Sequence, residues 1–165
     1  MAKINHLDAD DRAILTLAAC IGSNFSESTL RTLCDAAMPN SDGITACNST
    51  GRPSSSITEV DCYKDQGKFK MLLNSLTGVN VKEIIMKLDR EGLIIRTGLK
   101  SQSRYKFSHD KIQEAAYRLT PEIDRPMMHL QIGRIFLEDA KSHSNVDENL
   151  FAIVDQLNHG KNYEE

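Results

Sequence analysis

The sequence predicts a mainly α-helical protein, a winged helix followed by packed helices, and three observations support this. Aromatic residues make up only 5% of the chain and Trp is absent, so aliphatic side chains must fill the core, which favours helices. In several segments apolar residues recur every three to four positions, the spacing of one helix face. Two short segments within 93–107 alternate instead and predict a hairpin. Three helices followed by a two-stranded wing is the plan of a winged helix.

The N-terminal residues predict the first two helices. Asp8 can cap the first helix, and Gly22 ends it. Ser26 or Ser28 can cap the second helix, and Pro39 follows its apolar face. Two helices are therefore expected between residues 8 and 38.

A segment poor in apolar residues follows. Residues 39–78 are rich in Ser, Thr, Gly and Asn, so we expect a disordered insertion there. Within it, only the apolar run 69–73 suggests a helical turn that returns the chain to the core.

The third helix has the clearest boundaries in the sequence. Asn80 and Glu83 match the N-x-x-E pattern of a capping box, and Gly92 supplies the C-terminal stop. The hairpin segments 93–95 and 104–107 follow, separated by a polar tip. Residues 7–107 are thus expected to form the winged-helix domain.

Residues 108–160 predict a helical segment, the start of a helical arm with a repeat-like arrangement. One helix begins near Asp110, and Thr120-Pro121 offers the start of the next. Pro126 should kink or split that second helix. We expect a last helix over 147–158, whose predicted inward residues are Leu150, Phe151, Val154 and Leu157. Residues 161–165 are expected to form a tail.

Composition and motifs exclude several functions. The sequence lacks a phosphate-binding loop, a dinucleotide fingerprint and a nucleophile elbow, so no enzymatic activity is expected of this chain. The four cysteines have no zinc-finger spacing, and no metal site is predicted. A net charge of −3 without a basic block makes a nucleic-acid partner unlikely by composition. No signal peptide or membrane-length apolar run is seen, and we expect a cytoplasmic protein.

Two histidines stand out among the five. His129 lies among apolar helical neighbours, which predicts a partly buried, hydrogen-bonded side chain. His109 lies at the junction of strand and helix, where free backbone N–H groups attract anions, so it could contact a phosphate. The alternative is a solvated histidine beside an Asp110-Gln113 helix cap.

Four stretches of sequence resemble one family. They are LAACIGSNF, YKFSHDKIQEAAYRL, HLQIGRIFL and LFAIVDQLNHG. In this order they resemble the winged helix and following helices of AAA-like, STAND-class ATPase modules. Those modules occur in multidomain signalling proteins of bacteria, fungi and protists, together with serine/threonine-kinase-like and sensor histidine kinase domains of two-component type.

The resemblance implies a regulatory role. In this family the winged helix packs on a nucleotide-binding core, and a His-Asp pair after the hairpin helps to hold bound ADP. His109 would then be the nucleotide phosphate sensor, while Asp110 would cap the helix and orient His109. The core that binds ATP or ADP is absent from this sequence, so we expect the chain to be part of a larger ATPase or kinase. Its partners would be its own upstream core, the kinase domains and other signalling proteins.

Two other functions are compatible with the sequence. A DNA-binding winged-helix regulator could use Lys82, Lys87 and Arg90 on the third helix, with Lys100 and Arg104 on the wing. Against this, Glu83, Asp89 and Glu91 share that helix. A protein-interaction module could instead use the C-terminal helices.

Overall fold

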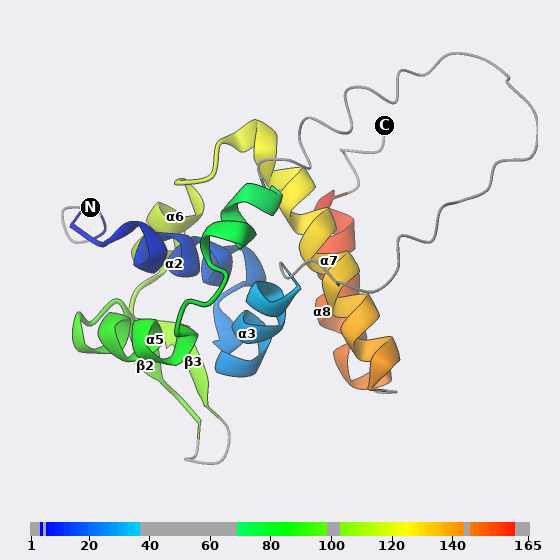
Figure 1. The fold of residues 1–165 in the computed structure, drawn as a ribbon, viewed down its shortest axis with the longest axis horizontal. Coiled ribbons are helices and arrows are strands. Elements are labelled where there is room, and N and C mark those ends of the chain that lie inside the picture. The colour runs from blue at the N-terminus through cyan, green and yellow to red at the C-terminus, as the bar shows by residue number, and fades with distance from the viewer. Residues whose placement is uncertain (1–3, 5, 37–68, 99–102, 144–145, 161–165) are drawn as a thin grey trace, which may run out of the picture.

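The chain is mainly helical and carries one small antiparallel sheet (Figure 1), which confirms the predicted mainly α class. The computed structural model describes residues 4, 6–36, 69–98, 103–143 and 146–160. The N-terminal half contains α2 (Ala9–Ile21), β1 (Asn24–Ser26), α3 (Glu27–Asp35), a helix over 69–75, α5 (Val81–Arg90) and β2 (Ile94–Arg96). The C-terminal half contains β3 (Arg104–Phe107), α6 (Asp110–Tyr117), the 3-10 helix η1 (Glu122–Asp124), α7 (Arg125–Ser142) and α8 (Val146–Gly160).

Helix α2 is the central helix of the molecule. It contacts α3, α5, α6, α7 and β1, and most of its length is buried. Ile14, Leu15 and Leu17 are fully buried although they point in different directions around the helix. The other helices are therefore arranged around α2.

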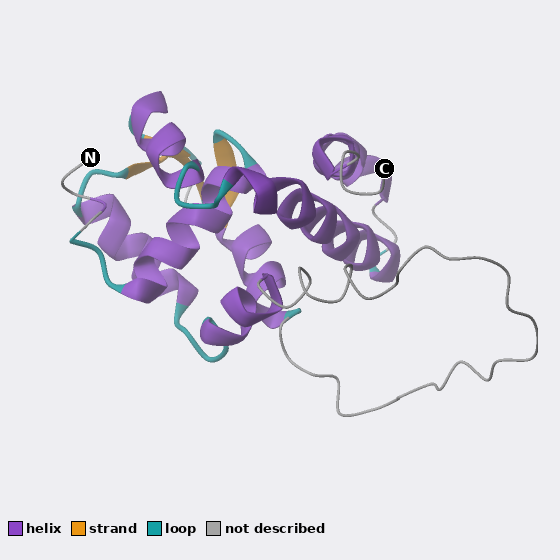
Figure 2. Cartoon of the chain, turned by 90° about the horizontal axis from the view of Figure 1, so that it is seen from above, coloured by secondary structure: helices purple, strands orange, loops and turns teal. Residues whose placement is uncertain are grey.

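The sheet has three strands in the order β1-β3-β2, one more than the predicted hairpin. The additional strand, β1, pairs antiparallel with β3 and places Phe25 opposite Tyr105. The ring of Phe25 also lies 5.6 Å from that of Phe107, measured between centroids. Figure 2 shows the strands at one end of the helical molecule. A strand of three residues is too short to display an alternating pattern, so the sequence did not reveal it.

Local capping explains where two helices begin. Ser26 accepts a hydrogen bond from the Thr29 N–H at 3.0 Å at the start of α3. Asn80 accepts one from the Glu83 N–H at 3.3 Å at the start of α5. Gly92 follows α5 with a φ of 69°, a left-handed conformation that favours glycine. These boundaries confirm the predicted caps and stop.

The predicted cap of α2 is wrong in one respect. Asp8 occupies the N-cap position, but its side chain makes no capping hydrogen bond. Its carboxylate instead lies 2.7 Å from Lys87 Nζ on α5, and Asp11 lies 2.6 Å from the same nitrogen. Asp11 is only 4% exposed, so Lys87 neutralises a buried charge. The ion pairs fasten α5 to α2.

The predicted disordered insertion is wrong over its last quarter, where the helical turn predicted for 69–73 is confirmed. Residues 69–75 form a helix, and Phe69, Leu73 and Leu76 are buried in the core. Apolar residues at i, i+4 and i+7 give this segment a core-facing side. The expectation for 39–68 lies outside the described residues.

The entry into α7 follows the prediction only partly. The chain splits before Pro126, as expected, and this proline occupies the first turn of α7. However, Thr120-Pro121 does not begin a helix that continues into α7, because η1 intervenes at Glu122–Asp124.

Helices α7 and α8 pack side by side along one edge of the molecule (Figure 1). Gly133 and Gly160 allow this close approach: a Cβ added at Gly160 would lie 2.8 Å from Leu130 Cβ. No helix in the described part of the chain is both long and apolar enough to cross a bilayer.

The predicted inward face of α8 is wrong. Phe151 is 89% exposed, and Leu150 and Val154 are also exposed, whereas Ile153 and Gln156 are each 2% exposed. Only Leu157 is partly buried against the core as expected. The buried face of α8 is rotated from the predicted one because Gly160 packs against Leu130 and Gln156 bonds to Cys20. Hydropathy does not select either of these two residues as buried.

Candidate functional site

The junction between β3 and α6 is fixed to the neighbouring turn. Ser108 donates a side-chain hydrogen bond to the carbonyl of Gly92 at 2.7 Å, and its N–H donates to the carbonyl of Leu93 at 3.0 Å. His109 comes next with an extended backbone, φ −148° and ψ 144°. Its position in the fold is therefore defined on both sides, by the sheet and by the helix.

His109 and Asp110 are both exposed at this junction. His109 is the N-cap residue of α6 and makes no side-chain capping bond. Asp110 is the first helical residue, so its predicted role as the cap is wrong: a cap needs the extended backbone that His109 has. No hydrogen bond joins the two side chains in the described structure, although the Asp110 carboxylate lies in the first turn, where the helix dipole favours negative charge.

Asp110 also lines a cavity that the sequence did not predict. The cavity has a volume of about 390 Å³ and lies among the C-terminal end of α2, one face of α6, and helices α7 and α8. Its other polar lining side chains are Gln113, Glu114, Tyr117, His129, Asp155 and His159. His109 is not among the lining residues.

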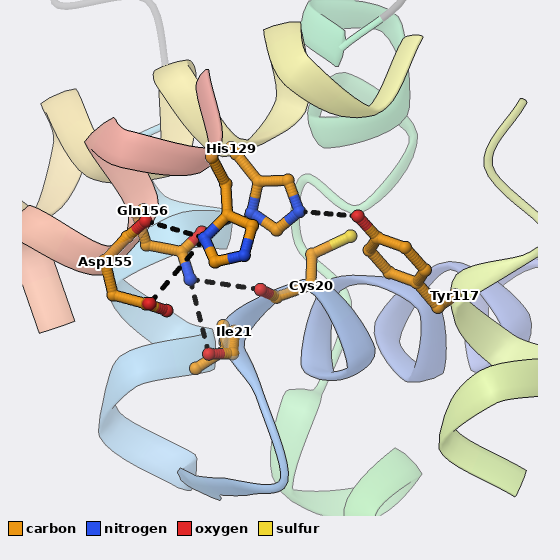
Figure 3. Close-up of polar contacts among 7 residues, drawn as sticks. Cys20, Ile21, Tyr117, His129, Asp155 and Gln156 are labelled. Carbon is orange, nitrogen blue, oxygen red and sulfur yellow. Dashed lines mark hydrogen bonds and ion pairs between the residues drawn. The ribbon is translucent and has the colours of Figure 1, made fainter. Parts of the chain in front are cut away.

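A largely buried chain of hydrogen bonds lies beside this cavity, and Tyr117 and His129 belong both to the chain and to the cavity lining (Figure 3). Tyr117 Oη lies 2.9 Å from His129 Nε2, and His129 Nδ1 lies 2.8 Å from Gln156 Oε1. Gln156 Nε2 donates to the carbonyl oxygens of Cys20 at 3.1 Å and Ile21 at 3.3 Å. The chain therefore joins α6, α7 and α8 to the last turn of α2.

The direction of each hydrogen bond follows from the two carbonyls at its end. Carbonyl oxygens only accept, so the Gln156 amide nitrogen must face them and its oxygen must face His129. That oxygen needs a donor, which places the imidazole proton on Nδ1. Nε2 is then an acceptor and takes the Tyr117 hydroxyl proton. A neutral His129 satisfies every group in the chain.

Burial favours the neutral form of this histidine. Burial lowers the pKa of His129 below its usual 6.5, and the hydrogen bond to Gln156 opposes that effect. Burial likewise raises the pKa of Tyr117, so the phenol keeps the proton that it donates. The Arg125 guanidinium lies 4.6 Å from the centre of the Tyr117 ring, in cation–π contact.

The Cys20 thiol beside this chain is not a nucleophile. Cys20 is 2% exposed, and burial raises its pKa to about 12. A thiol that stays protonated does not attack substrates or bind metals readily. Cys20 and Cys34 are both free and buried, as predicted for small core residues.

Two of the carboxylates that line the cavity are paired with basic side chains. Glu114 is held by Lys111 and Arg118, and Asp155 lies 3.6 Å from His159 Nδ1. Within the described ranges no group of three His, Cys, Asp or Glu residues is arranged to hold a metal ion. A second cavity of about 370 Å³ is more apolar and lies between α2, the helix over 69–75 and the start of α7.

The sequence indicated one member of the buried chain and missed two. His129 was predicted to be partly buried and hydrogen-bonded, and it is 5% exposed with two partners, which confirms this. Tyr117 and Gln156 were not selected. One signal for Gln156 was available in the sequence: it lies three positions after Ile153, on the helix face that ends at Gly160. A polar residue on a buried face needs a hydrogen-bond partner, so this position could have indicated a buried hydrogen bond.

Comparisons with protein-family models, with curated proteins and with solved structures found no match to this chain.

Proposed function

We propose that this chain is the winged-helix and helical-arm segment of a STAND-class, AAA-type ATP-binding signalling protein, and that it senses nucleotide held by a separate core. Its role is regulatory rather than catalytic. The observation that supports the proposal best is the exposure of His109, at the uncapped start of α6 directly after the sheet.

The order of elements also supports the winged-helix part. Helices α2, α3 and α5 precede the β2–β3 hairpin, and β1 between the first two helices pairs with β3. A winged helix consists of such a three-helix group with a wing. The resemblance of the 105–119 sequence to the family's His-Asp motif adds the nucleotide function.

The chemistry at His109 suits an anion. The backbone N–H groups of Asp110 and Lys111 have no acceptor among the described residues, as is usual for a first helical turn. A phosphate oxygen beside these groups would accept from them and from the imidazole. The Asp110 carboxylate lies in the first turn of α6, where it interacts favourably with the helix dipole.

The test uses a protein in which this chain is joined to its nucleotide-binding core. His109→Ala should weaken ADP retention about tenfold or more, the loss of one charge-assisted hydrogen bond. Asp110→Asn should have a smaller effect. His143→Ala, at another exposed helix end, is the matched control. Unchanged ADP affinity and signalling in His109→Ala would rule the proposal out, and the isolated chain should bind no ADP by calorimetry.

A second candidate function, a helical protein-interaction module, is favoured by the apolar surface of α8. Leu150, Phe151 and Val154 lie one turn apart or less and are all exposed. Phe151→Ser should reduce self-association in sedimentation experiments if this surface mediates contacts. By contrast, the DNA-binding alternative loses support, because Lys87 is already held by Asp8 and Asp11.

A further inference from the structure

One buried polar side chain of α8 is hydrogen-bonded directly to the end of α2. Gln156 is 2% exposed and its amide makes three hydrogen bonds, to His129, Cys20 and Ile21. The opposite face of α8, around Phe151, is exposed. Loss of the Gln156 contacts would therefore remove the hydrogen bonds between α8 and the end of α2, while the packing of α8 on α7 would remain.

The hydrogen bonds of this chain depend in turn on the protonation state of His129. A neutral imidazole offers one donor and one acceptor, and here both are matched. A protonated imidazole offers two donors. The Tyr117 hydroxyl would then have to turn its proton away from Nε2, and a positive charge would be enclosed with no carboxylate hydrogen-bonded to it.

We propose that Tyr117, His129 and Gln156 form a pH-sensitive latch, which holds α8 against the end of α2 while His129 is neutral and releases it when His129 is protonated. The latch is independent of nucleotide binding at His109. It is a conformational device within the helical arm.

The charged groups around His129 come from every neighbouring helix. On α8, Asp155 favours a protonated His129, whereas His159 opposes it, with ring centroids 5.0 Å apart. On α7, Arg125 also opposes it. The other titratable groups are Cys20 on α2 and Asp110, Glu114 and Tyr117 on α6, which line the same cavity.

Burial outweighs these charges, so the closed latch favours neutral histidine. In the open form His129 is solvated and has its usual pKa of 6.5, whereas in the closed form its pKa is lower. The latch is therefore at full strength above pH 6.5 and weakens as the pH falls below 6.5. One proton changes the opening equilibrium by up to about tenfold per pH unit.

Amide hydrogen exchange of the complete 165-residue chain tests this inference. Rates at pH 7.5, 6.5 and 5.5, corrected for intrinsic exchange, should show α8 opening up to about fivefold more at pH 5.5 than at pH 6.5, with α5 unchanged. His129→Asn keeps a donor near the Nδ1 position and cannot be protonated, so it should remove the pH dependence. His159→Gln should retain it. Equal pH dependence in wild type and His129→Asn would overturn the proposal.

A second measurement decides the matter if His129→Asn does not fold. The ring resonances of His129, followed by NMR, should titrate below pH 6.5 in the wild type. Tyr117→Phe should shift that titration upward, because the neutral ring loses its hydroxyl donor. Titration at or above pH 6.5 in the wild type would show that the closed form does not exclude the proton, and the latch would be refuted.

Discussion

Gln156 on α8 donates a hydrogen bond of 3.1 Å to the carbonyl oxygen of Cys20, a residue 136 positions earlier in the chain. The last carbonyls of a helix have no partner within it. Here a side chain from the opposite end of the sequence satisfies two of them, at Cys20 and Ile21. The arm is thereby joined to the central helix at a defined position.

Replacement of Gln156 by methionine should be destabilising although the shape is kept. The change leaves His129 Nδ1 and two carbonyl oxygens buried without partners, at a cost of about 1–3 kcal/mol in the free energy of unfolding. Urea denaturation measures this difference. Asn158→Ala, an exposed change on the same helix, should alter stability by less than about 0.5 kcal/mol, and an equal loss in both variants would contradict the assigned contacts.

The orientation of α8 can be tested with two residues two positions apart. Ile153 is 2% exposed, so Ile153→Ala should cost about 2–5 kcal/mol. Phe151 is 89% exposed, so Phe151→Ala should change stability by less than about 0.5 kcal/mol. Thermal or urea unfolding of both variants shows which face of α8 is buried. If Phe151 faced the core, as hydropathy predicts, Phe151→Ala would cause the larger loss of stability.

The two glycines between α7 and α8 should respond differently to alanine. At Gly160 the added Cβ meets the backbone of Leu130 at 2.9 Å, which cannot move easily, so Gly160→Ala should cost about 1–3 kcal/mol. At Gly133 the closest atom is Leu157 Cδ2, the end of a flexible side chain. Gly133→Ala should therefore be less destabilising, and calorimetric unfolding of the pair should give that order.

The Lys87 ion pairs should make stability depend on pH in the acid range. Hydrogen bonding and charge from Lys87 lower the pKa of Asp8 below 3.8, so its contribution is present above pH 3.8 and is lost as the pH falls through the lowered pKa. Lys87→Met should lower the unfolding midpoint at pH 7, and the difference from wild type should shrink at pH 3. Lys82→Met, an exposed change on the same helix, is the control. A difference that stays constant between pH 7 and pH 3 would exclude this mechanism.

Local signals in the sequence were sufficient for the central elements. The caps at Ser26 and Asn80 and the stop at Gly92 depend on side-chain chemistry within one turn, and they lie where that chemistry requires. Features that depend on distant partners were missed. Asp8 matches a cap by type, but Lys87 binds it instead, and only the packing of α5 on α2 reveals that.

The same distinction explains the candidate site. The position of His109 between strand and helix could be predicted because it follows from adjacent elements. Tyr117, His129 and Gln156 form one hydrogen-bond chain only after three helices have packed together, so no spacing in the sequence links them. The face of α8 was mispredicted because hydropathy ranks Phe151 above Gln156, whereas the structure buries the amide whose three partners compensate its loss of hydration.

The pairing of β1 with β3 also sets the order in which this protein can fold during synthesis. Ser26 lies opposite Arg104, so the edge strand has no partner until a further 78 residues have been translated. At typical elongation rates this takes about 4–16 s, far longer than a helix needs to form. Phe25 therefore cannot pack against Tyr105 and Phe107 until that part of the chain has been made.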